Sequence, residues 1–451
     1  MNENQTSKFK NRKFATAFFL LILTFCFVFA KSSFQADFKS KLHLRANALN
    51  SAAISWFETR VNLGFLPLRS RKFDSKIEVE IRTKGFPKLT STNQLDEPSL
   101  FEPVDVMLSE AYFQLYEVLP GLSFSAGRQL IHWGTADAIN PTNNIVAPDY
   151  SDPIVWDAKR PAWLIHTEYM PIPWVGLELV AKPVFESAMV PPKSWFWIEN
   201  LPATELLRRG LIASFISQGI DSLTAQTIAS NYTITVSEDF QLPKNTLKAM
   251  SYGGRIKTHF SIFDVSASLF RGYDFLPYAT PITTINPEAF TLDFVLQERY
   301  PRQTIVGGDI ATNLLGIGIW AEAGYSFYND SLPKDKLTFI AGADYSFSGF
   351  YTNLQFLRGP FPLAMTDPKS DYNFILGTLE RRLFDDRLLL RAGGIIDVKK
   401  GSYGFLPLVR WMPISGLQFD IGGLVFGGKA NSAFKPLEDI KEVFFGVRYQ
   451  F

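Results

Sequence analysis

The chain has 451 residues, of which 46% are apolar and 15% are aromatic, and its 45 basic side chains almost balance the 44 acidic ones. The net charge of +1 gives no reason to expect a nucleic-acid partner, because a phosphate-binding surface needs clustered, unopposed Lys and Arg. The 41 Phe, 16 Tyr and 9 Trp are unusually numerous. In membrane barrels such side chains occupy the lipid-facing band and its two interfaces.

The amino-terminal segment has the pattern of a secretory signal peptide. Four basic residues between positions 8 and 13 precede an apolar run over residues 14–30. We therefore predict a signal peptide over residues 1–30, cleaved after Ala30, and a mature chain of residues 31–451. The alternative is an uncleaved membrane anchor, because the run is near the lower length limit for crossing a bilayer. Cys26 is the only cysteine, so cleavage leaves no thiol for disulfides, catalysis or metal binding.

Segments with alternating apolar and polar residues recur along the mature chain, and such alternation places one class of side chain on each face of a strand. Clear examples are residues 57–65, 76–84, 250–260, 317–327 and 337–347. Their lengths suit a tilted membrane strand, which needs about nine to eleven residues. No later segment has eighteen uninterrupted apolar residues, so a membrane-embedded mature chain must cross as a closed sheet.

The last twelve residues, Ile440–Phe451, are the clearest strand of this kind. Every second residue from Val443 to Phe451 is apolar, and the positions between them are largely polar. The aromatic carboxy-terminus resembles the terminal strand signal of outer-membrane β-barrels, which their assembly machinery reads. This resemblance implies two partners, the outer-membrane assembly machinery and membrane lipid.

Short and long connections alternate between these segments. In outer-membrane barrels the short turns are periplasmic and the longer loops are external. We therefore predict an all-β fold, a transmembrane antiparallel β-barrel of about 18 strands (about 16–18), with long extracellular loops, in the bacterial outer membrane. An even count leaves both chain ends in the periplasm, Ala289–Leu296 is a candidate extra strand, and the fixed-period repeat of a β-propeller or β-helix is not found. The predicted tight turns lie near residues 67–72, 120, 170–173, 261–262, 315, 348, 385–386 and 412–415.

If the apolar face of each strand meets lipid, the other face lines the lumen. That face carries basic and acidic side chains in nearly equal number, and desolvating them unpaired would cost several kcal/mol each, so the interior is wet or densely ion-paired. A lining of mixed sign predicts no strong ion selectivity. The structural alternative is that these residues form cross-strand ion pairs that hold the register. The predicted lumen-lining residues are Arg60, Arg82, Glu110, Glu168, Glu178, Lys182, Arg255, Lys257, Asp309, Glu322, Asp344, Arg391, Arg410 and Arg448.

The third long connection begins with a distinctive spacing of residues. It reads Arg128-Gln129, then Trp133-Gly134, then Asp137, then Asn140-Pro141. This spacing resembles a segment of uncharacterised porin-like outer-membrane β-barrel proteins of Gram-negative bacteria. The resemblance implies a barrel and names no substrate.

In porin-like barrels the third loop commonly folds into the lumen, so we predict a lumen-constricting loop over residues 132–160. Gly134 and Asn140-Pro141 supply turns for a compact loop, and its carboxylates would face lumen arginines. The alternative is a surface loop whose Trp133 and Trp156 lie at the outer interface. The predicted constriction residues are Arg128, Asp137, Asp149, Asp152, Asp157 and Arg160.

Arg128 is the difficult member of this set. It shares the parity of Leu122 and Phe124, which would point it at lipid. A β-bulge at Gly127 would turn it inward, and we predict one there.

The fourth loop, residues 185–247, is the longest connection. Ala203–Ser217 is predicted to form a short amphipathic helix. Its apolar stripe consists of Leu206, Leu207, Leu211 and Phe215. Such a helix, preceded by the aromatic segment 195–197, could cap the pore or bind an external partner. We prefer the alternative in which it packs on apolar residues of its own loop.

Nothing in the sequence indicates catalysis. His43, His132, His166 and His259 are the only histidines, and they fall in separate segments without metal-ligand spacing. We therefore predict no enzyme, no catalytic residues, no cofactor and no metal.

The sequence predicts a passive diffusion channel for small hydrophilic solutes, with size exclusion at the constriction. One alternative is a surface-exposed barrel with a blocked lumen whose outer loops bind a ligand or partner. Another is a transporter of apolar compounds, which would need an aromatic lumen pocket. Homotrimers are common among such proteins, although no strand here stands out as an interface.

Overall fold

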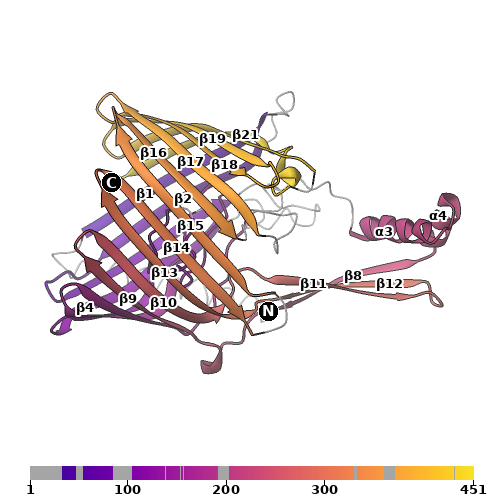
Figure 1. Cartoon of the computed structure of the whole chain (residues 1–451), viewed down its shortest axis with the longest axis horizontal. Helices are drawn as coiled ribbons and strands as arrows, with labels where there is room; N and C mark the ends of the chain where they lie inside the picture. Colours follow the sequence, from indigo (N-terminus) through magenta and orange to yellow (C-terminus); the bar gives the residue numbers. More distant parts are fainter. Residues whose placement is uncertain are drawn as a thin grey trace, which may run out of the picture.

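The computed structural model describes residues 33–46, 54–84, 104–137, 139–152, 154–155, 157–190, 203–329, 333–359, 371–430 and 432–451. The predicted signal peptide, Trp156 and the aromatic segment 195–197 lie outside these residues. The elements below are numbered as in Figure 1.

Eighteen strands pair in chain order into one antiparallel sheet that closes on itself (Figure 1), as the sequence predicts. The first strand, β1 (Ser33–Arg45), pairs with β2 (Ile54–Leu66) on one side and with the last strand, β21 (Lys441–Gln450), on the other. The described ring therefore has no free edge. Between β2 and β21 it contains β3 (Phe73–Lys84), β4 (Val104–Leu119), β5 (Leu122–Gln129), β6 (Ala162–Ile172), β7 (Val175–Lys182), β9 (Ser251–Phe260), β10 (Phe263–Tyr273), β13 (Arg302–Leu314), β14 (Ile317–Tyr328), β15 (Lys336–Phe347), β16 (Phe350–Gly359), β17 (Tyr372–Leu383), β18 (Leu388–Asp397), β19 (Tyr403–Ile414) and β20 (Leu417–Gly427).

The predicted short turns gather at one end of the barrel. Two of them are two-residue connections with positive φ at both residues: 55° and 81° at Leu315 and Gly316, and 47° and 77° at Ser348 and Gly349. Such turns match the right-handed twist of the paired strands. The backbone N–H of Ala36 donates to the carbonyl of Phe451 over 2.8 Å, so the first and last strands also meet at this short-turn end. The described parts of the predicted long connections lie at the opposite, long-loop end.

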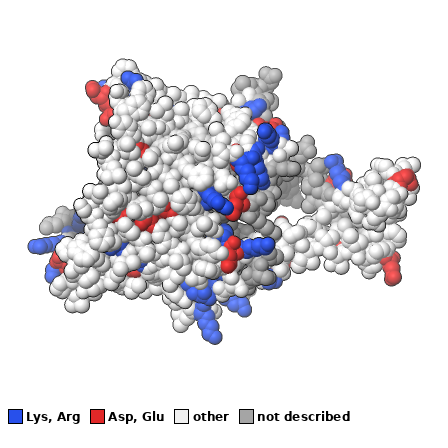
Figure 2. All heavy atoms as spheres, viewed as in Figure 1, with Lys and Arg blue, Asp and Glu red and all other residues white. Residues whose placement is uncertain are grey.

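The register fixes which side chains share a face, because directly paired residues on neighbouring strands point the same way. One face carries exposed apolar side chains, such as Leu179 on β7 and Leu354 on β16. The opposite face carries most of the ionisable side chains of the strands. Figure 2 shows that most of the visible barrel wall is uncharged. The apolar face is therefore the outside of the ring and the charged face its lumen.

A separate arm projects away from the long-loop end of the barrel (Figure 1). It holds a three-stranded sheet of β8 (Thr233–Gln241), β12 (Thr291–Arg299) and β11 (Tyr278–Asn286), together with α3 (Ala203–Ser217) and α4 (Ser222–Ser230). The candidate extra strand at 289–296 thus forms as β12, but in the arm and not in the barrel, because it pairs only with β8 and β11. Two 3-10 turns, η3 (Leu247–Ala249) and η4 (Lys435–Leu437), complete the elements.

Neither α3 nor α4, the helices of the described residues, is long and apolar enough to span a membrane.

The outward apolar face gives a first prediction. We expect Ile310→Arg, on the outer face of β13, to lower the free energy of unfolding in lipid vesicles by about 2–4 kcal/mol, because a cation near mid-bilayer loses its hydration. Leu315→Arg, in the fully exposed turn that follows the same strand, should cost almost nothing. Denaturant titration in vesicles measures both, and equal costs would contradict the assignment of the outer face.

Candidate functional site

The third loop, residues 130–161, lies inside the ring and contacts opposite parts of its wall. The indole Nε1 of Trp133 donates to Glu178 of β7 over 2.8 Å. Asp137 accepts a hydrogen bond from Asn353 of β16 at 3.0 Å. Trp133 is fully buried, so the alternative in which it anchors at the outer interface is wrong. The loop therefore crosses the lumen, and how far it narrows the bore stays a prediction.

Glu322 on β14 holds the first half of this loop. Its carboxylate accepts the backbone N–H groups of Thr135, Ala136 and Thr142 at 2.9, 3.0 and 2.7 Å, and the Thr142 hydroxyl at 2.9 Å. Gly134 is required next to it, because its φ is +90° and a Cβ there would lie 2.4 Å from the Glu322 carboxylate. A side chain predicted only to line the lumen thus anchors the loop.

The second half of the loop is held by basic side chains of β1, β2 and β3. Asp149 lies 3.8 Å from the Arg60 guanidinium and 3.5 Å from that of Arg82. Asp152 forms an ion pair with Lys41. The guanidinium of Arg60 also donates to the Ser151 hydroxyl over 3.2 Å. Asp149 and Asp152 therefore touch the basic wall directly and do not face it across a gap.

The charges on this wall govern the protonation of the loop carboxylates. Burial alone would raise the pKa of Asp149, but hydrogen bonds from Ser151 and the charges of Arg60 and Arg82 outweigh it and lower that pKa. Burial would likewise raise the pKa of Asp152, but the charge of Lys41 and its hydrogen bond help to lower it. Both carboxylates are thus ionised when the loop is docked near neutral pH.

Asp137 is in the opposite situation. Burial raises its pKa, and the nearby carboxylates of Asp344 and Asp157 raise it further against the hydrogen bond from Asn353. Asp157 itself is exposed. Arg160, the last predicted constriction residue, donates to the Ser187 carbonyl over 3.1 Å. The loop's carboxylates are thus split between a basic wall and an acidic one.

The prediction for Arg128 is wrong. The pairing of β5 with both neighbours runs through Gly127 without a register shift, so the expected bulge does not form. Arg128 keeps the outer parity, donates to the Leu108 carbonyl over 2.7 Å, and pairs with Glu186 at 2.5 Å. Because an outward cation needs a partner, the pairing with Glu186 replaces any role in the lumen.

The fourteen predicted lumen-lining residues all share the inner face by register, which closes around the ring. Many form cross-strand ion pairs, as the structural alternative predicts. The Arg410 and Asp420 side chains pair at 2.9 and 3.1 Å, and the Lys257 ammonium lies 2.8 Å from Glu178. What these residues contribute to solute passage is not fixed by their position.

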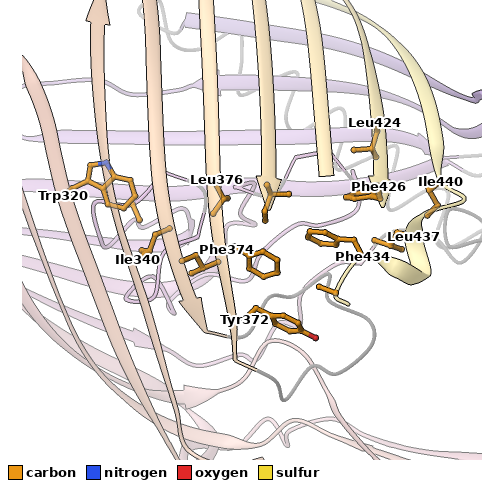
Figure 3. Packing of buried hydrophobic residues seen from close by; sticks show 14 residues of the cluster. Trp320, Ile340, Tyr372, Phe374, Leu376, Leu424, Phe426, Phe434, Leu437 and Ile440 are labelled. Carbon is orange, nitrogen blue, oxygen red and sulfur yellow. The ribbon is translucent and has the colours of Figure 1, made fainter. Parts of the chain in front are cut away.

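The long-loop half of the lumen also holds an apolar cluster that the sequence analysis missed (Figure 3). Phe434, in the loop before β21, stacks on Phe374 of β17 with ring centres 5.5 Å apart and contacts Phe426 of β20 at 5.3 Å. Ala136 and Ile154 of the third loop pack in the same cluster. Two loops that are far apart in the sequence therefore contribute to one apolar cluster inside the barrel.

The residues that the sequence analysis did not identify differ in whether a sequence pattern marks them. Phe374 and Phe426 occupy inner-face positions, so an apolar residue on the polar parity was a readable sign of something packed inside the ring. Phe434 sits in a loop without periodicity, and no local pattern marks it. Lys41 was readable, because it shares the inner parity of its strand with Lys39 and His43.

The predicted helix at 203–217 forms with those bounds as α3. Leu207, Leu211 and Phe215 pack with Tyr232 of the same loop, as the preferred interpretation predicts, and also with Leu292 of the connection between β10 and β13. The arm points away from the barrel (Figure 1), so α3 does not cap the lumen.

Among the described residues, no three His, Cys, Asp or Glu side chains are grouped so that they could hold a metal ion.

No protein-family model and no curated protein matches the chain. Among solved structures the chain is similar to Salmonella typhi OmpF in its complex with daunomycin, with 9% identity and a TM-score of 0.40 over 93% of this chain and 97% of that one. The fold rests on the strand pairing described above and not on this distant likeness.

The anchor at Glu322 gives a second prediction. We expect Glu322→Ala to free residues 134–142, because each buried N–H left unpaired costs about 1–3 kcal/mol. Limited proteolysis of the protein in detergent should then cut this loop at least tenfold faster. Asp344→Asn, on the inner face of the adjacent strand, serves as the control. Unchanged protection in Glu322→Ala would show that the loop is held elsewhere.

Lys159 gives a third prediction. Burial lowers its pKa to about 8, although Glu322 and Asp157 act in the opposite direction. A released loop would hold that proton up to the ordinary lysine pKa near 10.4, so docking should strengthen as pH rises from about 8 to about 10.4. A spin label at Asn144→Cys, in a Cys26→Ser background, should become less mobile over this range. Lys159→Met should abolish the trend, and a trend that persists in this variant would contradict the assignment.

Proposed function

We propose that this protein is a porin-like outer-membrane channel for the passive diffusion of small hydrophilic solutes, restricted by its third loop. The observation that carries the proposal is that residues 130–161 lie inside a closed ring and are held there by ionised inner-face side chains of opposite walls. A loop fixed in this way sets the widest solute that can pass. The ion pairs that hold the loop leave polar groups along the passage, although Ala136 and Ile154 pack in an apolar cluster.

The short-turn half of the lumen supports a hydrated path. The Lys39 and Arg448 side chains there are 44% and 38% exposed, and both pair with Asp37. Arg391, on the same inner face, is 35% exposed and pairs with Glu380. A hydrated lining that carries side chains of both charges attracts neither cations nor anions strongly, so weak ion selectivity is expected.

The outer-membrane location and the partners belong to the same proposal. The apolar outer face suits contact with membrane lipid, and the barrel fold is consistent with an outer membrane. The aromatic carboxy-terminus at Phe451 supports recognition by the assembly machinery. The resemblance of the third loop to porin-like proteins of Gram-negative bacteria points the same way, and a homotrimer would be compatible with it. No catalytic step is proposed.

One specific observation favours the second candidate, a barrel with a blocked lumen whose outer loops bind a partner. The loops around Ala136 and Phe434 meet in the apolar cluster, and both residues are fully or almost fully buried. Apolar contact excludes water, so this part of the lumen is sealed while the loops stay docked. Transport of apolar compounds would need a free aromatic pocket, but the ring of Phe434 already packs against Phe374 and Phe426. The Phe434 side chain would have to move out before an apolar compound could bind there.

Planar-bilayer recording separates these functions and gives a fourth prediction. The wild-type protein should show stepwise openings, and the double variant Asp149→Asn/Asp152→Asn should raise the conductance of each step, because it releases the loop from the basic wall. Asp420→Asn, on β20 in the short-turn half of the lumen, is the matched control, because Asp420 pairs with Arg410 and not with the described residues of the loop. A silent wild type with a conducting Phe434→Ala variant would favour the blocked barrel. Silence of all variants after verified insertion would overturn the channel.

A further inference from the structure

The arm is the largest feature that the proposed channel does not use, and its sheet has two unlike faces. The register of β11, β12 and β8 places Ile234, Val236, Leu292, Phe294 and Leu296 on one face. The other face carries mainly Thr, Ser, Gln and Asp, although Ile282 and Val295 interrupt it. When such a sheet stands in water, its apolar face must be covered by other apolar groups.

The helices cover only the far half of the apolar face. Ile234, Leu292 and Phe294 pack with Leu211 and Ala229 of α3 and α4. Closer to the barrel the same face continues without such a cover. Val236 is 37% exposed and Phe240 is 50% exposed there.

Acidic side chains flank this uncovered part. Glu238 of β8 is paired in register with Leu296, and Glu298 of β12 with Phe240, so both carboxylates point to the apolar face. The three strands together carry four acidic side chains and one basic one. We name the surface formed by Val236, Glu238, Phe240, Leu296 and Glu298 the arm patch.

We propose that the arm patch binds a cationic amphipathic segment of another protein or peptide. Apolar side chains of the segment would cover Val236, Phe240 and Leu296, and its Lys or Arg side chains would pair with Glu238 and Glu298. Charge complementarity favours this occupant, because a cationic amphipathic segment covers the apolar surface and also pairs with both carboxylates. The arm lies beyond the long-loop end, where such a partner can reach it (Figure 1).

Two other occupants fit less well. A second copy stacked face to face would bring its own Glu238 and Glu298 against these two carboxylates, and like charges in one interface cost several kcal/mol. An anionic lipid surface would be repelled in the same way. Neither offers cations to the arm patch.

The test uses the full-length protein in nanodiscs of zwitterionic lipid and two fluorescent amphipathic helical peptides of equal length. One peptide is built from Leu and Lys and the other from Leu and Glu. We expect anisotropy titrations to give a Kd at least tenfold lower for the Leu/Lys peptide. Glu238→Lys/Glu298→Lys should reverse this preference, and Val236→Thr/Phe240→Ser should weaken binding of the Leu/Lys peptide at least tenfold.

Asp239→Lys/Asp293→Lys is the matched control. It makes the same change of charge on the same two strands, but on the opposite face of the sheet. If this variant reverses the preference equally, general electrostatics explains the binding and the proposal fails. It also fails if the Leu/Lys peptide binds empty nanodiscs as tightly, if neither peptide binds, or if light scattering shows self-association that Val236→Thr/Phe240→Ser removes. Bilayer conductance of these variants should stay unchanged, which separates this proposal from the channel.

Discussion

Closure of the sheet is the constraint on which everything else in this structure depends. A backbone N–H or C=O without a partner in hydrocarbon costs several kcal/mol, so a strand-built membrane protein cannot leave an edge. Here β21 supplies the missing partner for β1. Once the ring closes, alternate side chains of every strand point either to the outside of the ring or to its lumen. The outside is mostly apolar, which suits contact with lipid, and most of the charge lies on the inside.

The confined charges then determine how the third loop is held. A charged group that is buried must find a partner, and the loop supplies carboxylates to Arg60, Arg82 and Lys41 and backbone donors to Glu322. Polar anchors of this kind are directional, so they fix the path of a segment that has no regular structure. The apolar contacts around Phe434 are less directional, and they close the remaining space on the side where the wall itself is apolar.

The arm follows a different rule, because it stands outside the ring. Its sheet has free edges and must bury its apolar face with its own helices. The helices are long enough for only part of that face, which leaves hydrophobic residues between acidic ones. The barrel and the arm thus bury an amphipathic sheet in two ways: the first closes into a ring around its polar face, and the second covers part of its apolar face with helices.

The sequence by itself determined the barrel, its eighteen strands, the alternation of short turns and long loops, and the helix at Ala203–Ser217. These features depend on periodicity and turn residues within short segments, so local pattern was enough. It also identified the inner face, since parity follows from the same alternation. Only the tertiary structure decided what that face contacts. Whether Glu322 lines a pore or anchors a loop, whether Arg128 pairs in the lumen or outside it, and where Phe434 packs all depend on partners from other segments of the chain, such as Thr135, Glu186 and Phe374. No local pattern encodes such contacts.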